Sequence, residues 1–262
     1  MRIEVLGCSG GIGDGRHTTS FLIDDDILID AGSGALKLTR AAMAKIDHVF
    51  ITHSHLDHIL SLPLLLDSVG NERDKPLQLH AIPEVLVILK DHLFNWRIWP
   101  DFSRVPSIKA PFLVFSPLPL GQVWNLTDAS GMAREITPIP AHHTVPTSGF
   151  HLHGSNGSLL FSGDTNSHPE LWRLVGQIPD LLHLVVECSY VSAQRDIAEA
   201  SRHFHALELA SDLAMLELTA EVWITHLKPG AEDEIMAELL GNLPADMRLA
   251  IERLKLGQVF HI

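Results

Sequence analysis

One short segment concentrates residue types that bind metal ions. Residues 52–58 read Thr-His-Ser-His-Leu-Asp-His, so three imidazoles and one carboxylate lie within six residues. Imidazole suits zinc, iron and related metals, and a carboxylate adds an anionic oxygen ligand. His53 and His55 alternate, so an extended loop lets both face one ion. Asp57 and His58 turn into the next predicted helix and face a second point nearby, which favours two adjacent ions.

Two ions need further ligands, and we expect these at the ends of other strands. Three candidates directly follow predicted strands: His143, Asp164 and His226. His142 is adjacent to His143, so either imidazole can be the ligand there. Structural zinc sites are usually closed, cysteine-rich sets of four ligands. Seven His and Asp ligands without cysteine therefore predict an open, catalytic centre.

The composition of the chain restricts the classes of protein and partner. The chain has 262 residues, of which 46% are hydrophobic and 19% charged, which excludes a mainly disordered protein. Acidic residues outnumber Lys and Arg by 32 to 19, and the formal net charge is −13. Such a surface repels phosphate backbones, so long nucleic acids and anionic membranes are poor partners. A small anionic substrate held by metal remains compatible with this charge.

The cysteines and the N-terminus predict a cytoplasmic protein. Cys8 and Cys188 are the two cysteines, and both lie in apolar surroundings, which excludes a disulfide framework and fits a reducing compartment. The first residues read as a strand rather than as a basic region followed by an apolar stretch, so no signal peptide is expected. The most apolar run, residues 59–66, is about a third of a membrane span.

The elements that must position the metal ligands form two similar halves. Strands are predicted at residues 3–6, 20–23, 27–29, 48–52, 77–80, 112–115, 134–140, 149–153, 158–162, 184–187 and 221–225. Helices are predicted at residues 37–45, 84–94, 169–175, 200–215 and 232–240. Each half opens with strands and continues with alternating strands and helices. This pattern predicts a four-layer αβ/βα sandwich, an α/β fold, as one domain over residues 1–262. Residues 94–119, rich in proline and aromatics, are expected to be an insertion or lid.

The ligand pattern resembles the core motif of the metallo-β-lactamase superfamily, His-x-His-x-Asp-His. The match continues through His143, Asp164 and His226 in the expected order. The resemblance implies the αβ/βα sandwich and two divalent ions, with zinc as the default and manganese or iron as alternatives. It also implies how the ligands divide: one ion is held by His53, His55 and His143, and the other by Asp57, His58 and His226. Asp164 would bridge the two ions.

Several segments resemble class II cyclic-nucleotide phosphodiesterases within that superfamily. They are residues 6–11, 28–34, 53–59, 94–102, 187–190 and 225–229. Pro63 departs from the aliphatic residue usual in that class. Residues 143–150 are closer to transfer-RNA 3′-processing endonucleases of the RNase Z type. Both relatives cleave phosphodiesters, so the resemblance implies that reaction.

The expected reaction is hydrolysis of a 3′,5′-cyclic nucleotide or a related small phosphodiester. A water shared by the two ions would lose its proton and attack phosphorus, and Asp57 would accept or relay a proton. The alternatives are an RNase Z-like nuclease, and a hydrolase of a lactone, thioester or sulfate ester on the same metals. The nuclease needs a basic surface or a tRNA-gripping arm, and the negative charge counts against it.

Two further sets of residues are candidates for contact with the substrate. His205 loosely matches a histidine of related phosphodiesterases that contacts the scissile phosphate or protonates the leaving group; its alternative is a helix-start histidine without a catalytic role. Asn95, Trp96 and Trp99 are predicted to bind substrate, with the tryptophans stacking on a base; otherwise they pack the insertion onto the core. The apolar residues of 94–119 leave a homodimer open.

Overall fold

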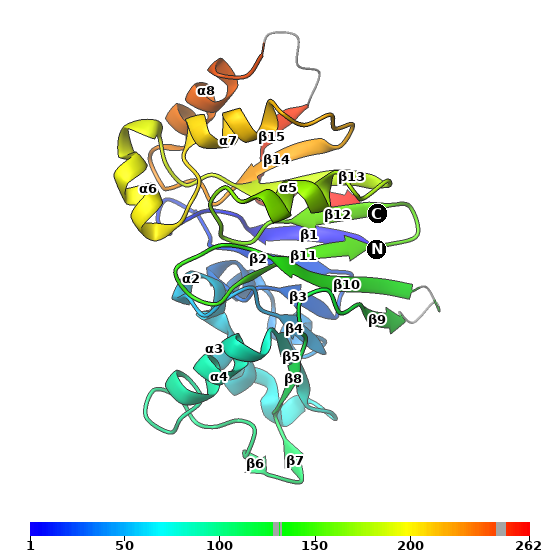
Figure 1. The fold of residues 1–262 in the computed structure, drawn as a ribbon. Helices are drawn as coiled ribbons and strands as arrows, with labels where there is room; N and C mark the ends of the chain where they lie inside the picture. The colour runs from blue at the N-terminus through cyan, green and yellow to red at the C-terminus, as the bar shows by residue number, and fades with distance from the viewer. Residues whose placement is uncertain (128–130, 132, 245–249) are drawn as a thin grey trace.

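Two mixed sheets lie face to face in the computed structural model, which describes residues 1–127, 131, 133–244 and 250–262 (Figure 1). The first sheet has the order β16-β1-β2-β3-β4-β5-β8 and the second β15-β14-β13-β12-β11-β10-β9. The strands of the first sheet are β1 (Arg2–Gly7), β2 (Ser20–Ile23), β3 (Ile27–Ile29), β4 (His48–Phe50), β5 (Leu77–Ala81), β8 (Leu113–Pro117) and β16 (Val259–His261). Those of the second are β9 (Trp124–Thr127), β10 (Ala133–Pro140), β11 (Ser148–His153), β12 (Ser158–Phe161), β13 (Leu181–Glu187), β14 (Glu221–Thr225) and β15 (Ile251–Arg253).

Helices cover the outer face of each sheet (Figure 1). The first sheet carries η1 (Ser33–Lys37), α1 (Arg40–Met43), α2 (Leu56–Ile59), α3 (Ser61–Val69), η2 (Gly70–Glu72) and α4 (Pro83–His92). The second carries α5 (Pro169–Val175), η3 (Ser192–Gln194), α6 (Arg195–Ser201), α7 (Ala206–Leu213) and α8 (Glu232–Gly241). Within the described part of the chain, none of the helices is long and apolar enough to cross a membrane.

Three separate hydrophobic clusters lie between the four layers. Side chains alternate between the two faces of a strand, so each sheet contributes to two clusters. The cluster between the sheets contains the aromatic residues Phe21, Phe50, Phe150 and Phe161, all buried. A second cluster joins the first sheet to α3 and α4, and a third joins the second sheet to α5, α7 and α8. The rigid sandwich that results holds the strand ends in place.

The directions of the strands bring the ligand-bearing loops to one edge. In the first sheet β3, β4, β5 and β8 are parallel neighbours, and in the second β12, β13, β14 and β15 are parallel. Strand β10 runs in the same direction as β12, because both pair antiparallel with β11. The loops that follow β10, β12 and β14 therefore leave the second sheet in the same direction, and a bridge between His53 and Thr147 joins this edge to the loop that follows β4.

The structure differs from the expected elements in several places, among them residues 200–215 and 94–119. The helix predicted over residues 200–215 is wrong: α6 ends at Ser201 and α7 begins at Ala206. Arg202 has a left-handed backbone (φ 53°), which stops α6, and His205 caps the start of α7. Within residues 94–119, strand β8 joins the first sheet, and β6 (Pro106–Ser107) and β7 (Ala110–Pro111) form a small separate hairpin. A lid role for this stretch stays a prediction.

Candidate metal centre

Four loops bring the seven predicted ligands to one edge of the sandwich. His53 and His55 follow β4, while Asp57 and His58 lie in the short helix α2. His143, Asp164 and His226 follow β10, β12 and β14. Five of these side chains, those of His53, His58, His143, Asp164 and His226, belong to buried residues. The structure thus places side chains from positions 53 to 226 within one cluster.

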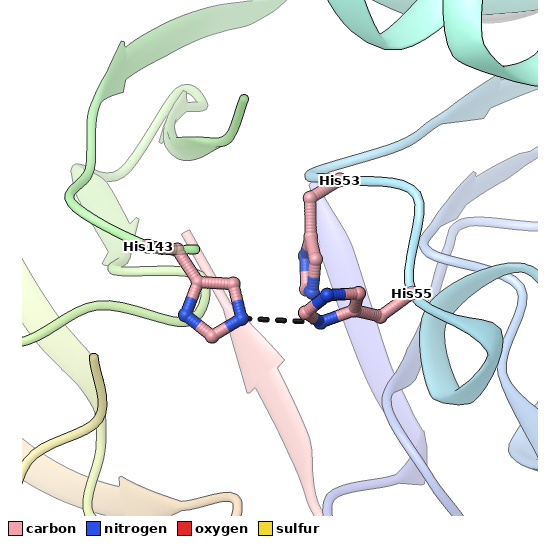
Figure 2. A group of neighbouring side chains, drawn as sticks. All are labelled: His53, His55 and His143. Atoms are coloured by element: carbon pink, nitrogen blue, oxygen red, sulfur yellow. Dashed lines mark hydrogen bonds between the residues drawn. The ribbon is translucent and has the colours of Figure 1, made fainter. Parts of the chain in front are cut away.

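The first group of donor atoms comes from His53, His55 and His143, whose rings converge (Figure 2). One nitrogen of each ring lies within 4.8 Å of the others. The Nε2 atom of His143 and the Nδ1 atom of His55 are 3.1 Å apart. Of the two adjacent histidines that the sequence left open, His143 is the one that faces this group, and His142 does not belong to it.

The second group comes from Asp57, His58, Asp164 and His226. The Oδ2 atom of Asp164 lies 3.3 Å from His58 Nε2 and 3.2 Å from His226 Nε2. The same oxygen is 3.7 Å from Nε2 of His53, which belongs to the first group. Asp164 therefore stands between the two groups, where a single carboxylate can serve both.

Unpaired nitrogen atoms show that this donor set fits metal ions. The Nε2 atoms of His53 and His58 are buried and have no hydrogen-bond partner among the described residues. A buried polar atom without a partner is unfavourable, and native structures rarely contain one without a reason. Two imidazole lone pairs that converge beside a buried carboxylate match the ligand types of zinc and related ions.

Hydrogen bonds on the opposite ring nitrogens orient these lone pairs. Asp30, fully buried, accepts from the Nδ1 atom of His58 at 2.7 Å and from the backbone N–H of Thr52 at 2.8 Å. The hydroxyl of Thr52 donates to Asp30 and accepts from Nδ1 of His53 at 3.0 Å. Because Nδ1 carries the proton in both rings, Nε2 is left as the donor atom toward an ion. The sequence analysis did not identify Asp30, although it immediately follows β3.

The ring of His226 is held in the same way. Its Nδ1 atom is 3.0 Å from the hydroxyl oxygen of Ser189, and that hydroxyl donates to Glu187 at 3.1 Å. The backbone of His226 is left-handed (φ 59°), and its N–H donates to the carbonyl of Cys8. Gly10 packs against this residue so closely that a Cβ atom would lie 2.4 Å from the His226 carbonyl oxygen. The glycine-rich loop after β1 therefore positions a candidate ligand.

His203 is a further histidine of the centre that the sequence analysis missed. Its ring is stacked on that of His226, with centroids 5.1 Å apart, and lies 4.8 Å from that of His143. Its Nδ1 atom is 2.6 Å from Oε1 of the buried Glu187. Burial lowers the pKa of His203 to about 4, and burial, reinforced by the charge of Asp164, raises the pKa of Glu187 to about 8. At neutral pH the two groups therefore hold one proton between them.

His205, which the sequence analysis selected from this segment, lies elsewhere. It is the N-cap of α7, where its Nδ1 atom accepts from the backbone N–H of Glu208 and is 3.1 Å from the hydroxyl of Ser192. The structure thus gives it the position of the helix-start histidine that was the alternative to a catalytic role. The left-handed turn at Arg202 is the physical reason, because it directs His203 toward the centre.

A cavity of about 480 Å³ opens beside the centre. Its lining includes His142, His143, Arg202 and Glu84, together with apolar residues such as Pro83 and Leu120. Arg202 also makes two hydrogen bonds with His143 of the first donor group. Its guanidinium donates to the carbonyl of His143, and its own carbonyl accepts from the ring of that residue.

The residues predicted to stack on a base lie on the segment after α4. Trp96 is 60% exposed, whereas Trp99 packs against the core of the first half. The amide of Asn95 accepts from the backbone N–H groups of Arg97 and Ile98, so it closes a local turn. None of these three residues lines the cavity beside the centre. Their contact with substrate stays a prediction, and Trp96 is the one whose ring is free to make it.

We expect acid to empty the two donor groups of metal in sequence. An imidazole must be neutral to bind metal. Burial lowers the pKa of His53 and lowers that of His143 to about 4, so protons compete for the first group only near that pH. Burial opposes protonation of His58 too, but the carboxylates of Asp164 and Asp30 raise its pKa well above the usual value. The ion of the second group should therefore leave first.

Metal content measured after dialysis between pH 7 and pH 4 checks this order. The expected curve has two steps, with the second at the acidic end of this range, because burial lowers the pKa of His143 to about 4. Full occupancy at the lowest pH, or loss of both ions in one step near the pKa of free histidine, would contradict it.

Comparisons with known proteins agree with this geometry. Residues 25–238 match the sequence profile of the family described as "Beta-lactamase superfamily domain". A "Probable 3',5'-cyclic-nucleotide phosphodiesterase" of Yersinia pestis is 25% identical over 317 aligned positions, which cover 98% of this chain and 88% of the relative. A ribonuclease Z of Phocaeicola vulgatus is 29% identical over 158 positions, which cover 57% of this chain and 48% of that protein.

A solved structure shares the whole fold. The crystal structure of unliganded yeast PDE1 superposes with a TM-score of 0.79 at 21% sequence identity, and 98% of each chain is covered. The four-layer sandwich predicted from the sequence is therefore confirmed. Both groups of phosphodiester-cleaving enzymes that the sequence resembles occur among the relatives.

Proposed function

Since this chain belongs to the β-lactamase superfamily and is a hydrolase of that superfamily, we propose that it is a two-metal phosphodiesterase of 3′,5′-cyclic nucleotides or a related small phosphodiester. The observation that carries the proposal is the position of Asp164. Its Oδ2 atom lies 3.2–3.7 Å from Nε2 of three histidines that belong to two groups of donors. A carboxylate shared in this way is suited to bridging two ions.

The seven candidate ligands would be divided between two divalent ions. His53, His55 and His143 would hold one, Asp57, His58 and His226 the other, and Asp164 both, with zinc as the expected metal. Such a pair of ions supplies a hydroxide nucleophile at neutral pH and neutralises the charge on phosphoryl oxygens. Burial alone would raise the pKa of Asp57, but the hydrogen bond with His226 and the charge of His58 lower it below its usual range. This carboxylate is therefore ionised, as a ligand or a proton acceptor must be.

In this proposal His203 donates a proton to the leaving oxygen. An alkoxide is a poor leaving group, so a proton delivered as the P–O bond breaks accelerates the reaction. At neutral pH Glu187 carries the proton that the pair shares, so Glu187 would protonate Nδ1 of His203 as the other ring nitrogen gives its proton to the leaving oxygen. A ring nitrogen of His203 lies within 4.8 Å of donor atoms of His143 and Asp164. The pair is buried, with His203 only 7% exposed, so water does not compete for that proton.

The cavity and the charge of the chain favour a small substrate. The cavity beside His143 combines apolar walls with one cation, Arg202, and one carboxylate, Glu84. Such a lining suits a base-and-sugar group of a nucleotide better than a phosphate backbone. The net charge of −13 works against the counterion release on which binding of a polynucleotide depends.

Turnover of three substrates, on protein whose metal content has been assayed, tests the proposal. We expect hydrolysis of 3′,5′-cyclic AMP and of bis(p-nitrophenyl) phosphate, and none of a precursor tRNA with a 3′ trailer. Cleavage of the tRNA without the cyclic nucleotide would replace the proposal with an RNase Z-like activity. Failure on all three, with two metals bound, would redirect the search to lactones, thioesters and sulfate esters.

A further inference from the structure

Arg202 has a backbone conformation that arginine rarely adopts. It caps the C-terminal end of α6, and its φ of 53° lies in the left-handed region. Glycine usually occupies such a position, because the Cβ atom of any other residue crowds the following carbonyl oxygen there. Strained backbone persists only where the surrounding structure holds it, and it is often found at functional sites. An arginine at this position therefore indicates that its side chain has a function.

The backbone and the side chain of Arg202 both bind His143. The carbonyl of Arg202 accepts from Nδ1 of His143 at 3.1 Å, and its Nη1 atom donates to the carbonyl of His143 at 2.8 Å. The opposite nitrogen of the same ring, Nε2, faces the first donor group (Figure 2). The guanidinium is therefore held beside a candidate ligand of the metal centre.

The remaining donors of this guanidinium are available to a ligand. Nε and Nη2 of Arg202 make no hydrogen bond or ion pair with any described residue, and the residue is exposed. Arg202 is the one lysine or arginine, among the described residues, that lines the cavity of about 480 Å³. Glu84 lines the same cavity, but the two side chains form no ion pair within the described part of the chain. The positive charge beside His143 is therefore not neutralised by this carboxylate.

We propose that Arg202 binds a non-bridging phosphoryl oxygen of the substrate, so that the site selects an anionic diester over a neutral ester. The inference rests on the proposed function. A guanidinium forms strong charge-assisted hydrogen bonds with phosphate oxygens. The net charge of −13 repels an anion at long range, so a cation next to the centre offsets that repulsion where the substrate binds. A lactone or thioester has no charge at its reacting group and would gain less from this contact.

Replacing Arg202 with glycine separates binding of substrate from support of the fold. Glycine adopts a φ of 53° without strain, and the backbone carbonyl that orients His143 remains. Metal content and Tm should therefore stay close to those of the wild type. The KM for bis(p-nitrophenyl) phosphate should rise about ten- to a hundredfold, the usual effect of losing one hydrogen bond to a charged group. The kcat should change less, because the contact is already made in the bound substrate.

Arg202→Gln and a matched control complete the kinetic test. Arg202→Gln removes the charge and keeps an amide donor near the carbonyl of His143, so it keeps the test valid if the glycine variant loses metal; its KM should rise by a similar factor. Arg195→Gln removes an exposed charge from the other end of α6 and should keep the wild-type KM. A wild-type KM in Arg202→Gln would overturn the proposal. An equal rise in Arg195→Gln would also overturn it, because the effect would then be one of long-range charge.

Calorimetric titration of the metal-loaded proteins with inorganic phosphate distinguishes failure of this inference from failure of the proposed function. We expect phosphate to bind Arg202→Gln more weakly than it binds the wild type and Arg195→Gln. That result in a protein that hydrolyses no phosphodiester would support the anion contact and refute the proposed function. Equal phosphate affinity and equal KM in an active phosphodiesterase would refute the role of Arg202 and leave the proposed function in place.

Discussion

Replacing Asp164 with alanine is expected to remove at least one bound ion and nearly all turnover. The Oδ2 atom of this residue lies 3.2–3.7 Å from Nε2 of His53, His58 and His226. Without it the three nitrogens would face an empty position, and the two ions would lose the group that holds them together. Both ions act on the same phosphoryl group, so losing one disables the reaction rather than slowing it modestly.

Metal analysis and turnover of bis(p-nitrophenyl) phosphate, measured on the same sample, decide this prediction. Asp67→Ala, on the exposed face of α3, is the matched control and should behave like the wild type. Asp164→Asn preserves the shape of the side chain and separates loss of the ligand from loss of the fold. A fully metallated Asp164→Ala protein with normal activity would refute the bridging role.

Replacing His203 with glutamine should slow cyclic AMP hydrolysis by about 10²–10⁴-fold, the usual contribution of a positioned general acid. The ribose alkoxide that leaves from a cyclic nucleotide needs a proton, and His203 is the residue that shares one with Glu187 beside the centre. The p-nitrophenolate that leaves from the generic diester is stable without a proton. The same variant should therefore hydrolyse bis(p-nitrophenyl) phosphate at close to the wild-type rate.

His205→Gln is the matched control for this prediction. It changes a histidine two positions away that caps α7 instead of facing the centre. It should leave the rates on both substrates nearly unchanged. Equal loss on both substrates in His203→Gln, with reduced metal content, would assign His203 to metal binding instead. A loss of cyclic AMP hydrolysis alone in His205→Gln would instead support the catalytic role that the sequence predicted for His205.

The fold and the positions of the ligands could be predicted because both depend on local patterns. Apolar runs separated by turns predicted strands whose bounds agree with β2, β3 and β14. The ligand motif after β4 is contiguous, so its residue types and spacing are visible in the sequence. Once strands are parallel, residues at their carboxyl ends must meet at one edge, and this rule selected Asp164 and His226 without knowledge of contacts.

Contacts between distant segments were decided only by the tertiary structure. Asp30 orients His58 from 28 positions away, and Ser189 orients His226 from 37 positions away. Neither pairing leaves a local signal, because a buried aspartate or serine beside a strand has many roles. The choice of His143 over His142 likewise depends on which side of the loop faces the first donor group.

The choice of His203 over His205 shows the physical reason most clearly. The sequence pattern treats this segment as part of one helix, because its apolar spacing continues through it. In the structure the backbone reverses at Arg202, where φ is 53°, and that reversal directs one histidine to the centre and the other to a helix cap. Residue type and spacing determine which groups can do the chemistry, whereas a single backbone turn, stabilised by contacts with His143, determines which of them reaches the site.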